Sequence, residues 1–243
     1  MVSHQSSPID FSAIKARQQI TWSTGNFSII GTTLVIVSEQ LCNAIDLHAG
    51  ENVLDVATGN GNTALAAARR FCEVTGIDYV PTLLEDGRQR AASEHLHVAF
   101  QDGDTENIPF ADASFDVVLS TFGVMFAPHQ EKAASEVLRV CRSGGKIGMA
   151  NWTPTGFIGD VFRLIGKYVP PPPGLKPASL WGTEERLRDL FGDGISSLQT
   201  TKRDFIFCYR SAAHWLEIFG TLLWPDCYNP QGPGRDEKRA VFT

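Results

Sequence analysis

The sequence lacks the long apolar stretch that a membrane-spanning helix needs. Its longest run of large aliphatic residues covers only Leu34 to Val37, far short of the roughly 20 residues that cross a bilayer. The amino terminus also lacks the charged start and the apolar middle of a signal peptide. Together these absences predict a cytoplasmic protein with no membrane span.

Cysteine pairs and metal-ligand spacings are missing too. The five cysteines are odd in number and widely scattered, and no CxxC motif occurs. Such a set indicates reduced thiols that pack as small apolar residues. The histidines and cysteines have no metal-ligand spacing, so no metal is expected.

Positive charge is in deficit. Lys and Arg number 21 against 27 Asp and Glu, a net charge of −6, and no basic block stands out. Nucleic acid is therefore disfavoured as the main partner, because phosphate binding needs a basic footprint. The chain has 243 residues, 43% of them hydrophobic, which suits one α/β domain with a buried core.

Short apolar runs alternate with helical periods along the chain. Strands are expected over residues 52–57, 74–78, 97–101, 115–120, 146–152 and 201–209. Helices are expected over residues 11–20, 32–45, 64–70, 131–140, 157–168 and 183–190, and one more begins at Pro81. This order predicts a Rossmann-like α/β fold, a doubly wound, mostly parallel sheet with helices on both faces. A seventh strand is not evident.

A glycine-rich turn, Asp55-x-x-x-Gly59-x-Gly61, follows the first expected strand. Glycines at a strand-to-helix turn let the backbone pass close to a ligand, because no Cβ stands in the way. The helix start behind them presents free N–H groups that favour an anionic group. A tight turn without a ligand would have the same sequence, so this motif alone leaves both interpretations open.

Acidic residues follow the next two expected strands. Asp78 ends the second strand, where a carboxylate can accept hydrogen bonds from ribose hydroxyls. Asp104 comes just past the third strand, where it can accept from an exocyclic amine. The carboxyl ends of parallel strands share one edge, so the turn and both acids are expected to meet there. A helix N-cap or a surface acid is the alternative for Asp78, and a plain polar turn is the alternative for Asp104.

Five segments occur in a fixed order between Asn52 and Trp152. They are Asp55-x-x-x-Gly59-x-Gly61, Asp78, Gly103-Asp104-x-x-x-Ile-Pro-Phe, Ser114-Phe-Asp116-x-Val and Glu136-x-x-Arg139-Val-x-x-x-Gly144-Gly145-Lys146. The series resembles class I S-adenosylmethionine-dependent methyltransferases, close to the ubiquinone and menaquinone biosynthesis C-methyltransferase type. The resemblance implies in-line transfer of a methyl group from S-adenosylmethionine to a small, partly apolar acceptor.

The resemblance also implies roles for the matched positions. Asp55 and the turn at Gly59 and Gly61 would hold the methionine portion of the cofactor. Asp78 would bind both ribose hydroxyls, and Tyr79 would pack on the adenine.

Further positions complete the implied cofactor site. The Thr105 backbone would lie beside Asp104, which would accept from the adenine amine. Phe122 and its neighbour Gly123 would lie under the sulfonium. Asn26 and Phe27 would belong to an amino-terminal loop that covers the cofactor.

Two positions depart from the family pattern. Ala57 stands where many members have the first glycine of the turn, and Asn62 where many have a third. Alanine is small enough for a turn residue with negative φ, so the cofactor site is expected to survive.

A general base is needed only if the acceptor must lose a proton. His129 is the catalytic candidate and His214 a second one, with a helix-start or surface position as the alternative for each. Aromatic residues that could line an acceptor pocket, or simply pack the core, are Trp22, Trp152, Phe157, Trp181 and Trp215.

The expected organisation is an N-terminal helical cap at 1–50 and a cofactor-binding core at 51–153. The substrate loop, helices and last strand of the same domain follow at 154–224, and a disordered tail is expected at 225–243. Two other functions stay open: a non-catalytic S-adenosylmethionine-binding protein, and a nicotinamide-dependent oxidoreductase, whose G-x-G-x-x-G/A form Gly59, Gly61 and Ala64 satisfy.

Overall fold

The computed structural model describes residues 9–24 and 27–223. Asn26 and the tail at 225–243, both singled out from the sequence, lie outside the described residues.

One parallel sheet of five strands forms the centre of the described structure. The strands are β1 (Asn52–Val56), β2 (Glu73–Asp78), β3 (Ala99–Asp102), β4 (Phe115–Thr121) and β5 (Cys141–Ala150). Their order in the sheet is β3-β2-β1-β4-β5, and every neighbouring pair is parallel. The chain thus winds outward from β1 in both directions, so the strand order reverses between β1 and β4. This confirms the predicted Rossmann-like, doubly wound sheet.

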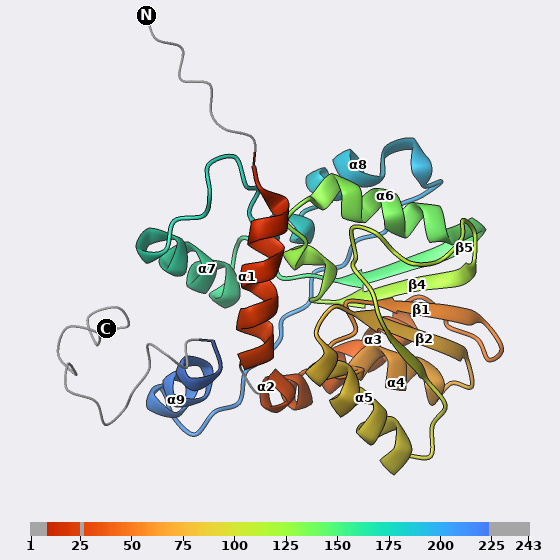
Figure 1. Ribbon diagram of the computed structural model, residues 1–243, viewed down its shortest axis with the longest axis horizontal. Helices are drawn as coiled ribbons and strands as arrows, with labels where there is room; N and C mark the ends of the chain where they lie inside the picture. The colour runs from red at the N-terminus through yellow and green to blue at the C-terminus, as the bar shows by residue number, and fades with distance from the viewer. Residues whose placement is uncertain (1–8, 25–26, 224–243) are drawn as a thin grey trace, which may run out of the picture.

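Helices cover both faces of the sheet (Figure 1). One face carries α3 (Val35–Ala44), α4 (Asn62–Ala68) and α5 (Pro81–Ser93). The other carries α6 (Gln130–Val140) and α8 (Glu184–Phe191), with the short helices η1 (Val124–Phe126), η2 (Ala178–Gly182) and η3 (Gly192–Gly194). Residues Ala133, Val137 and Val140 of α6 are fully buried, as their spacing predicts.

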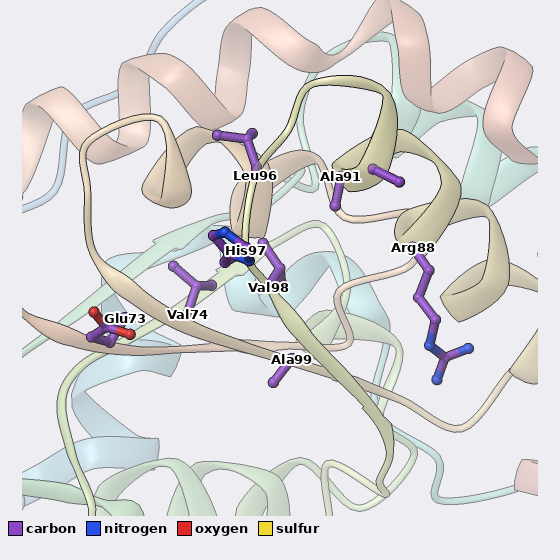
Figure 2. Close-up of a pocket in the computed structure, with 9 residues that line it drawn as sticks. Glu73, Val74, Arg88, Ala91, Leu96, His97, Val98 and Ala99 are labelled. Atoms are coloured by element: carbon purple, nitrogen blue, oxygen red, sulfur yellow. The ribbon is translucent and has the colours of Figure 1, made fainter.

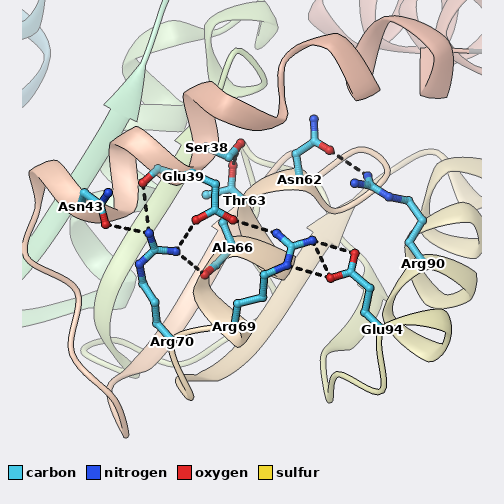
Figure 3. Close-up of polar contacts among 10 residues, drawn as sticks. All are labelled: Ser38, Glu39, Asn43, Asn62, Thr63, Ala66, Arg69, Arg70, Arg90 and Glu94. Atoms are coloured by element: carbon cyan, nitrogen blue, oxygen red, sulfur yellow. Dashed lines mark hydrogen bonds and ion pairs between the residues drawn. The ribbon is translucent and has the colours of Figure 1, made fainter.

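The three helices of the first face are joined by ion pairs (Figure 3). Glu39 of α3 accepts hydrogen bonds from Arg69 at 2.8 Å and from Arg70 at 2.6 Å, both just beyond α4. Arg69 also pairs with Glu94, just beyond α5. The alanine side chains of the buried α4 make no polar contacts, so these arginines beyond its end supply the ion pairs between the helices.

Four further helices form a group beside the sheet: α1 (Phe11–Thr24), α2 (Phe27–Thr33), α7 (Phe157–Tyr168) and α9 (Ala212–Leu223). In Figure 1, α1 runs between the sheet and the pair α7 and α9. Among the described residues no single helix is long and apolar enough to cross a bilayer; only α2 and α3 taken together reach that length and composition, with a 52° bend between them.

The predicted helix over residues 32–45 is two helices. It breaks at Leu34, whose backbone N–H donates to the Gly31 carbonyl at 2.9 Å and closes a turn. Helix α1 extends to Thr24 and includes Trp22, beyond the expected end at residue 20. The helical pattern therefore predicted helices in both segments, but not their boundaries.

The predicted sixth strand over residues 201–209 is wrong, because this segment pairs with no strand among the described residues. Its alternating Phe205 and Phe207 instead direct their rings against Trp152, at centroid distances of 6.2 and 5.7 Å. The alternation that resembled a strand thus serves side-chain packing.

The fifth strand was expected to begin at residue 146, but β5 begins at Cys141, so residues 143–145 lie inside it. The pairing of β4 with β5 shifts register there, between Phe115 and Val117. Gly144 has φ +73°, and a Cβ on Gly145 would lie 2.6 Å from the Asp116 carbonyl oxygen. The glycines thus form an irregularity within one strand instead of a boundary before it.

Candidate functional site

The glycine turn lies at the carboxyl end of β1. The Thr58 N–H donates to the Ile77 carbonyl at 2.9 Å, so the chain follows β2 for one residue before it turns. Gly59 has φ +55°, and no atom lies within 4 Å of the position that a Cβ would take there. This leaves open space directly above the turn, as a closely bound ligand requires.

The prediction of a negative φ at Ala57 is wrong, since its φ is +52°. The left-handed conformation is costly for a residue with a Cβ. Ala57 lies close to Gly123, beyond β4, where a Cβ would be only 2.4 Å from the Ala57 carbonyl oxygen, so position 123 requires glycine.

Asp55 is buried beneath the turn and holds it to α4. One carboxylate oxygen accepts from the Thr58 hydroxyl at 2.6 Å and from the Ala64 N–H at 2.9 Å. The other oxygen is buried without a hydrogen-bond partner among the described residues. Burial raises the pKa of this carboxyl to about 7. An unpartnered buried acceptor is costly unless a ligand or water donates to it.

Asp78 joins the turn to the end of β2. Its two oxygens accept from the Gly59 N–H and the Val80 N–H, each at 2.9 Å. Burial raises the pKa of Asp78 to about 6, although these backbone hydrogen bonds act in the opposite direction. A carboxylate has about four acceptor sites, so acceptor capacity remains for a hydroxyl donor beyond these backbone contacts.

Arg90 of α5 supports the same turn from the other side. Its guanidinium donates to the Asn60 carbonyl at 2.7 Å and to the Asn62 side-chain oxygen at 2.8 Å (Figure 3 shows the second contact). The Asn62 amide in turn donates to the Gly31 carbonyl of α2 at 2.7 Å. Sequence reasoning missed Arg90, because a lone arginine on a helix gives no sign of what it contacts.

Asp104 lies beyond β3 in a tight backbone turn. One of its carboxylate oxygens accepts from the Glu106 N–H at 2.9 Å, and the other pairs with Lys15 of α1 at 2.5 Å. Lys15 also pairs with Glu106 at 3.0 Å. Thr105, between the two acids, is 6% exposed. The pairing spans 89 residues of sequence, so no local pattern could have indicated Lys15.

Aromatic residues surround this edge of the sheet. Phe122 has φ +59° and stacks on Trp152, with a centroid distance of 4.0 Å and an interplanar angle of 3°. Trp22 contacts Phe27 edge-on at 4.7 Å. Burial raises the pKa of the Tyr79 hydroxyl well above its ordinary value. The structure thus brings Phe122 and Trp152, which follow β4 and β5, to the carboxyl edge with the turn and the acids.

His129 is the N-cap of α6. Its Nδ1 accepts from the Lys132 N–H at 3.3 Å, and its ring stacks on Phe11 at 4.6 Å. His214 similarly accepts from the Arg210 N–H at 3.3 Å. Both histidines therefore have structural roles, and catalysis by either stays a prediction. Trp181 is fully buried in the core, which favours the packing alternative for it.

A hollow on the surface lies away from these residues (Figure 2). It is lined by Glu73 at the start of β2, Ala99 at the start of β3, and Arg88 and Ala91 of α5. Asp78 ends the strand that Glu73 begins, so the hollow is at the amino-terminal edge, opposite the glycine turn.

Comparison with known proteins connects this geometry to one family. Residues 54–149 match the family described as "Methyltransferase domain". An uncharacterized protein of Mycobacterium tuberculosis is 38% identical over 191 residues, which cover 78% of this chain and 70% of that protein. A demethylmenaquinone methyltransferase of Deinococcus radiodurans is 37% identical over 51% of this chain and 53% of its own. The crystal structure of the YcgJ protein from Bacillus subtilis aligns with a TM-score of 0.52 and 26% identity over 63% of this chain and 67% of its own.

Proposed function

This chain belongs to the class I S-adenosylmethionine-dependent methyltransferase family, and we propose that it methylates a small, partly apolar acceptor by in-line displacement. Membership in the family sets aside the nicotinamide-dependent alternative for the glycine turn. The observation that carries the proposal is the joint placement of Gly59 and Asp78, hydrogen-bonded to each other where β1 and β2 end at the carboxyl edge of the sheet.

The residues at this edge fit the cofactor. The open space above Gly59 admits a ligand, and the unpartnered Asp55 oxygen can accept from its methionine amino group. Asp78 has remaining acceptor capacity for the ribose hydroxyls. When bound, S-adenosylmethionine supplies an electrophilic methyl group on a positively charged sulfonium. The acids Asp55, Asp78 and Asp104 therefore suit a ligand that carries positive charge.

The chain's own contribution to the reaction is alignment and the exclusion of water. A rigid turn and a fixed carboxylate orient the methyl donor, which lowers the entropy cost of reaching the acceptor. The stacked rings of Phe122 and Trp152 lie at the ends of β4 and β5 and present an apolar wall beside the turn. Phe157 contacts the Trp215 ring edge-on, with a centroid distance of 5.2 Å, and extends the aromatic surface around α7 and α9. This surface supports a partly apolar acceptor.

The stacked side chains of Phe122 and Trp152 contain no group that takes a proton. His129 is therefore proposed as the proton acceptor only for substrates that must lose a proton, acting through Nε2, because its Nδ1 already accepts from Lys132. An acceptor whose nucleophile is already deprotonated needs no such group.

Calorimetric titration of S-adenosylmethionine into wild type, Asp78→Ala and Asp78→Asn tests the cofactor site. Loss of two hydroxyl contacts to a carboxylate is expected to weaken binding on the order of 100-fold in the alanine variant. Asp102→Ala is the matched control, because Asp102 is the register partner of Asp78 on β3 and is exposed. It should bind nearly as wild type does.

Transfer of a labelled methyl group to a panel of small aromatic and aliphatic acceptors then tests turnover. Failure of well-folded wild type to bind S-adenosylmethionine would refute the proposed function. Binding without turnover on any acceptor would favour the non-catalytic alternative.

A further inference from the structure

One face of helix α1 contacts the carboxyl edge of the sheet. Lys15 pairs with Asp104 beyond β3, Gln18 donates to the Phe126 carbonyl beyond β4 at 3.0 Å, and Gln19 donates to the Tyr79 carbonyl at the end of β2 at 2.5 Å. Positions three and four apart share a helix face, so these side chains reach the edge together. Helix α1 therefore forms a wall of the proposed cofactor site.

Lys15 is the charged member of this face. Its ammonium lies 2.5 Å from Asp104 and 3.0 Å from Glu106, and its side chain is 27% exposed. Burial lowers the pKa of Lys15, but its hydrogen bonds to the two carboxylates outweigh burial and raise that pKa overall. The lysine is thus held as a cation between two acids.

Each oxygen of the Asp104 carboxylate has one contact in this arrangement, and Lys15 occupies the oxygen that does not bind the backbone. One oxygen accepts from the Glu106 N–H and the other binds Lys15. Glu106 is itself anchored, because its side chain is 7% exposed and accepts from the His129 N–H at 2.7 Å. Lys15 therefore has a second, fixed partner that it can keep if it leaves Asp104.

We propose that Lys15 is a positioning residue that competes with the adenine amine for Asp104 and thereby sets the affinity for the cofactor. This inference rests on the proposed function. Binding of the adenine exchanges the Lys15–Asp104 contact for an amine–Asp104 hydrogen bond, and Lys15 stays with Glu106. The contacts of Gln18 and Gln19 keep α1 on the edge during the exchange.

Calorimetric titration with S-adenosylhomocysteine, which has no sulfonium charge, isolates this effect from attraction between the cofactor and the acids. Lys15→Met removes the competitor and is expected to bind about five-fold more tightly than wild type, the size of one partly exposed ion pair. Lys15→Arg keeps the ion pair and should bind as wild type does. Unchanged or weaker binding by Lys15→Met would overturn the inference.

Glu106→Gln tests the same exchange in the opposite direction. The glutamine oxygen can still accept from the His129 N–H, but the substitution removes the second carboxylate partner of Lys15. Lys15 should then hold Asp104 more strongly, and S-adenosylhomocysteine should bind more weakly. The double variant Lys15→Met/Glu106→Gln should match Lys15→Met, because Glu106 acts through Lys15. An equal loss from Glu106→Gln in both backgrounds would contradict this route.

The adenine amine can be tested directly with 5′-methylthioadenosine and 5′-methylthioinosine. Lys15→Met should tighten binding of the first ligand and not of the second, which has no amine to donate to Asp104. Equal gains for both would overturn competition for Asp104. If wild type binds none of these adenosine ligands, the proposed function itself fails; if wild type binds them and Lys15→Met changes nothing, only the role of Lys15 fails.

Discussion

At the scale of single residues, Gly59 and Gly61 share a left-handed backbone but differ in their surroundings. A Cβ on Gly59 would enter open space, whereas a Cβ on Gly61, with φ +88°, would lie 2.8 Å from the Phe100 ring. Gly61→Ala should therefore lower the free energy of unfolding by about 2–4 kcal/mol, from strain and overpacking together. Gly59→Ala should cost only about 1–2 kcal/mol of stability but weaken S-adenosylmethionine binding at least about ten-fold, since its methyl enters the ligand space.

Gly50→Ala separates these two effects. Gly50 has φ +82° and no atom near its Cβ position, and it lies before β1, at the opposite edge. It should show the strain cost in urea unfolding and unchanged binding in calorimetry. If Gly59→Ala bound S-adenosylmethionine as well as Gly50→Ala does, the open space above Gly59 would not be the ligand site.

Residue-scale prediction from sequence worked for placement where neighbours in the chain decide it. Asp55, Gly59 and Asp78 were expected at one edge of the sheet, because strand ends, glycines and acids follow one another in the chain. Lys15 and the positive φ of Ala57 were missed: Lys15 pairs with Asp104, 89 residues away, and Ala57 lies against Gly123. Pairing of this kind leaves no signal within a short window.

At the scale of elements, α6 fixes the segment that carries Asp104. Glu136 accepts from the Ile108 N–H at 2.9 Å, and its side chain is only 6% exposed. Arg139 pairs with Glu136 at 2.7 Å and donates to the Ile108 carbonyl at 2.9 Å. The side chains of Glu136 and Arg139, which entered the sequence analysis only through the family resemblance, thus hold the loop at Ile108 against α6. Glu136→Ala should lower the free energy of unfolding by about 1–3 kcal/mol, because it leaves the buried Ile108 N–H without its acceptor.

Glu184→Ala is the matched control for Glu136→Ala. Glu184 pairs with Arg188 at 2.6 Å one turn along α8, and both side chains are at least half exposed. Its removal should change urea unfolding by about 0.5 kcal/mol or less. Similar losses in the two variants would show that burial of Glu136 contributes nothing special to the loop.

Prediction of elements succeeded for the buried strands and failed for the segment 201–209, which was expected to be a strand. Strands β1, β2 and β4 are apolar runs between turn residues, and the sheet buries them on both faces, so period and composition agree. The segment 201–209 has the alternation of a strand, yet its aromatic rings pack on Trp152 and Phe157 without a backbone ladder. Alternation reports which side chains share a face, and it does not report whether a neighbouring strand exists.

At the scale of the whole molecule, two buried acids at the site set how stability depends on pH. Burial raises the pKa of Asp55 to about 7 and that of Asp78 to about 6, from 3.8. The folded chain therefore binds these protons more tightly than the unfolded chain, so the free energy of unfolding should fall as pH rises from about 4 to about 7. Glu136 acts in the opposite sense, because hydrogen bonds from Arg139 lower its pKa to about 2 and its contribution disappears as pH falls below about 4.5.

These opposed pH dependences predict that the free energy of unfolding is largest near pH 4.5–5 and declines toward neutral pH. Urea unfolding of wild type and Asp55→Asn across pH 4–8 measures this decline. The asparagine oxygen can still accept from Thr58 and Ala64 but cannot ionise, so the decline between pH 5 and pH 7 should become shallower. A cationic ligand that stabilises the ionised acids should shift the maximum of wild type toward neutral pH. If wild type and Asp55→Asn show the same slope, burial of this carboxyl does not govern the pH profile, and the site is better solvated than its geometry indicates.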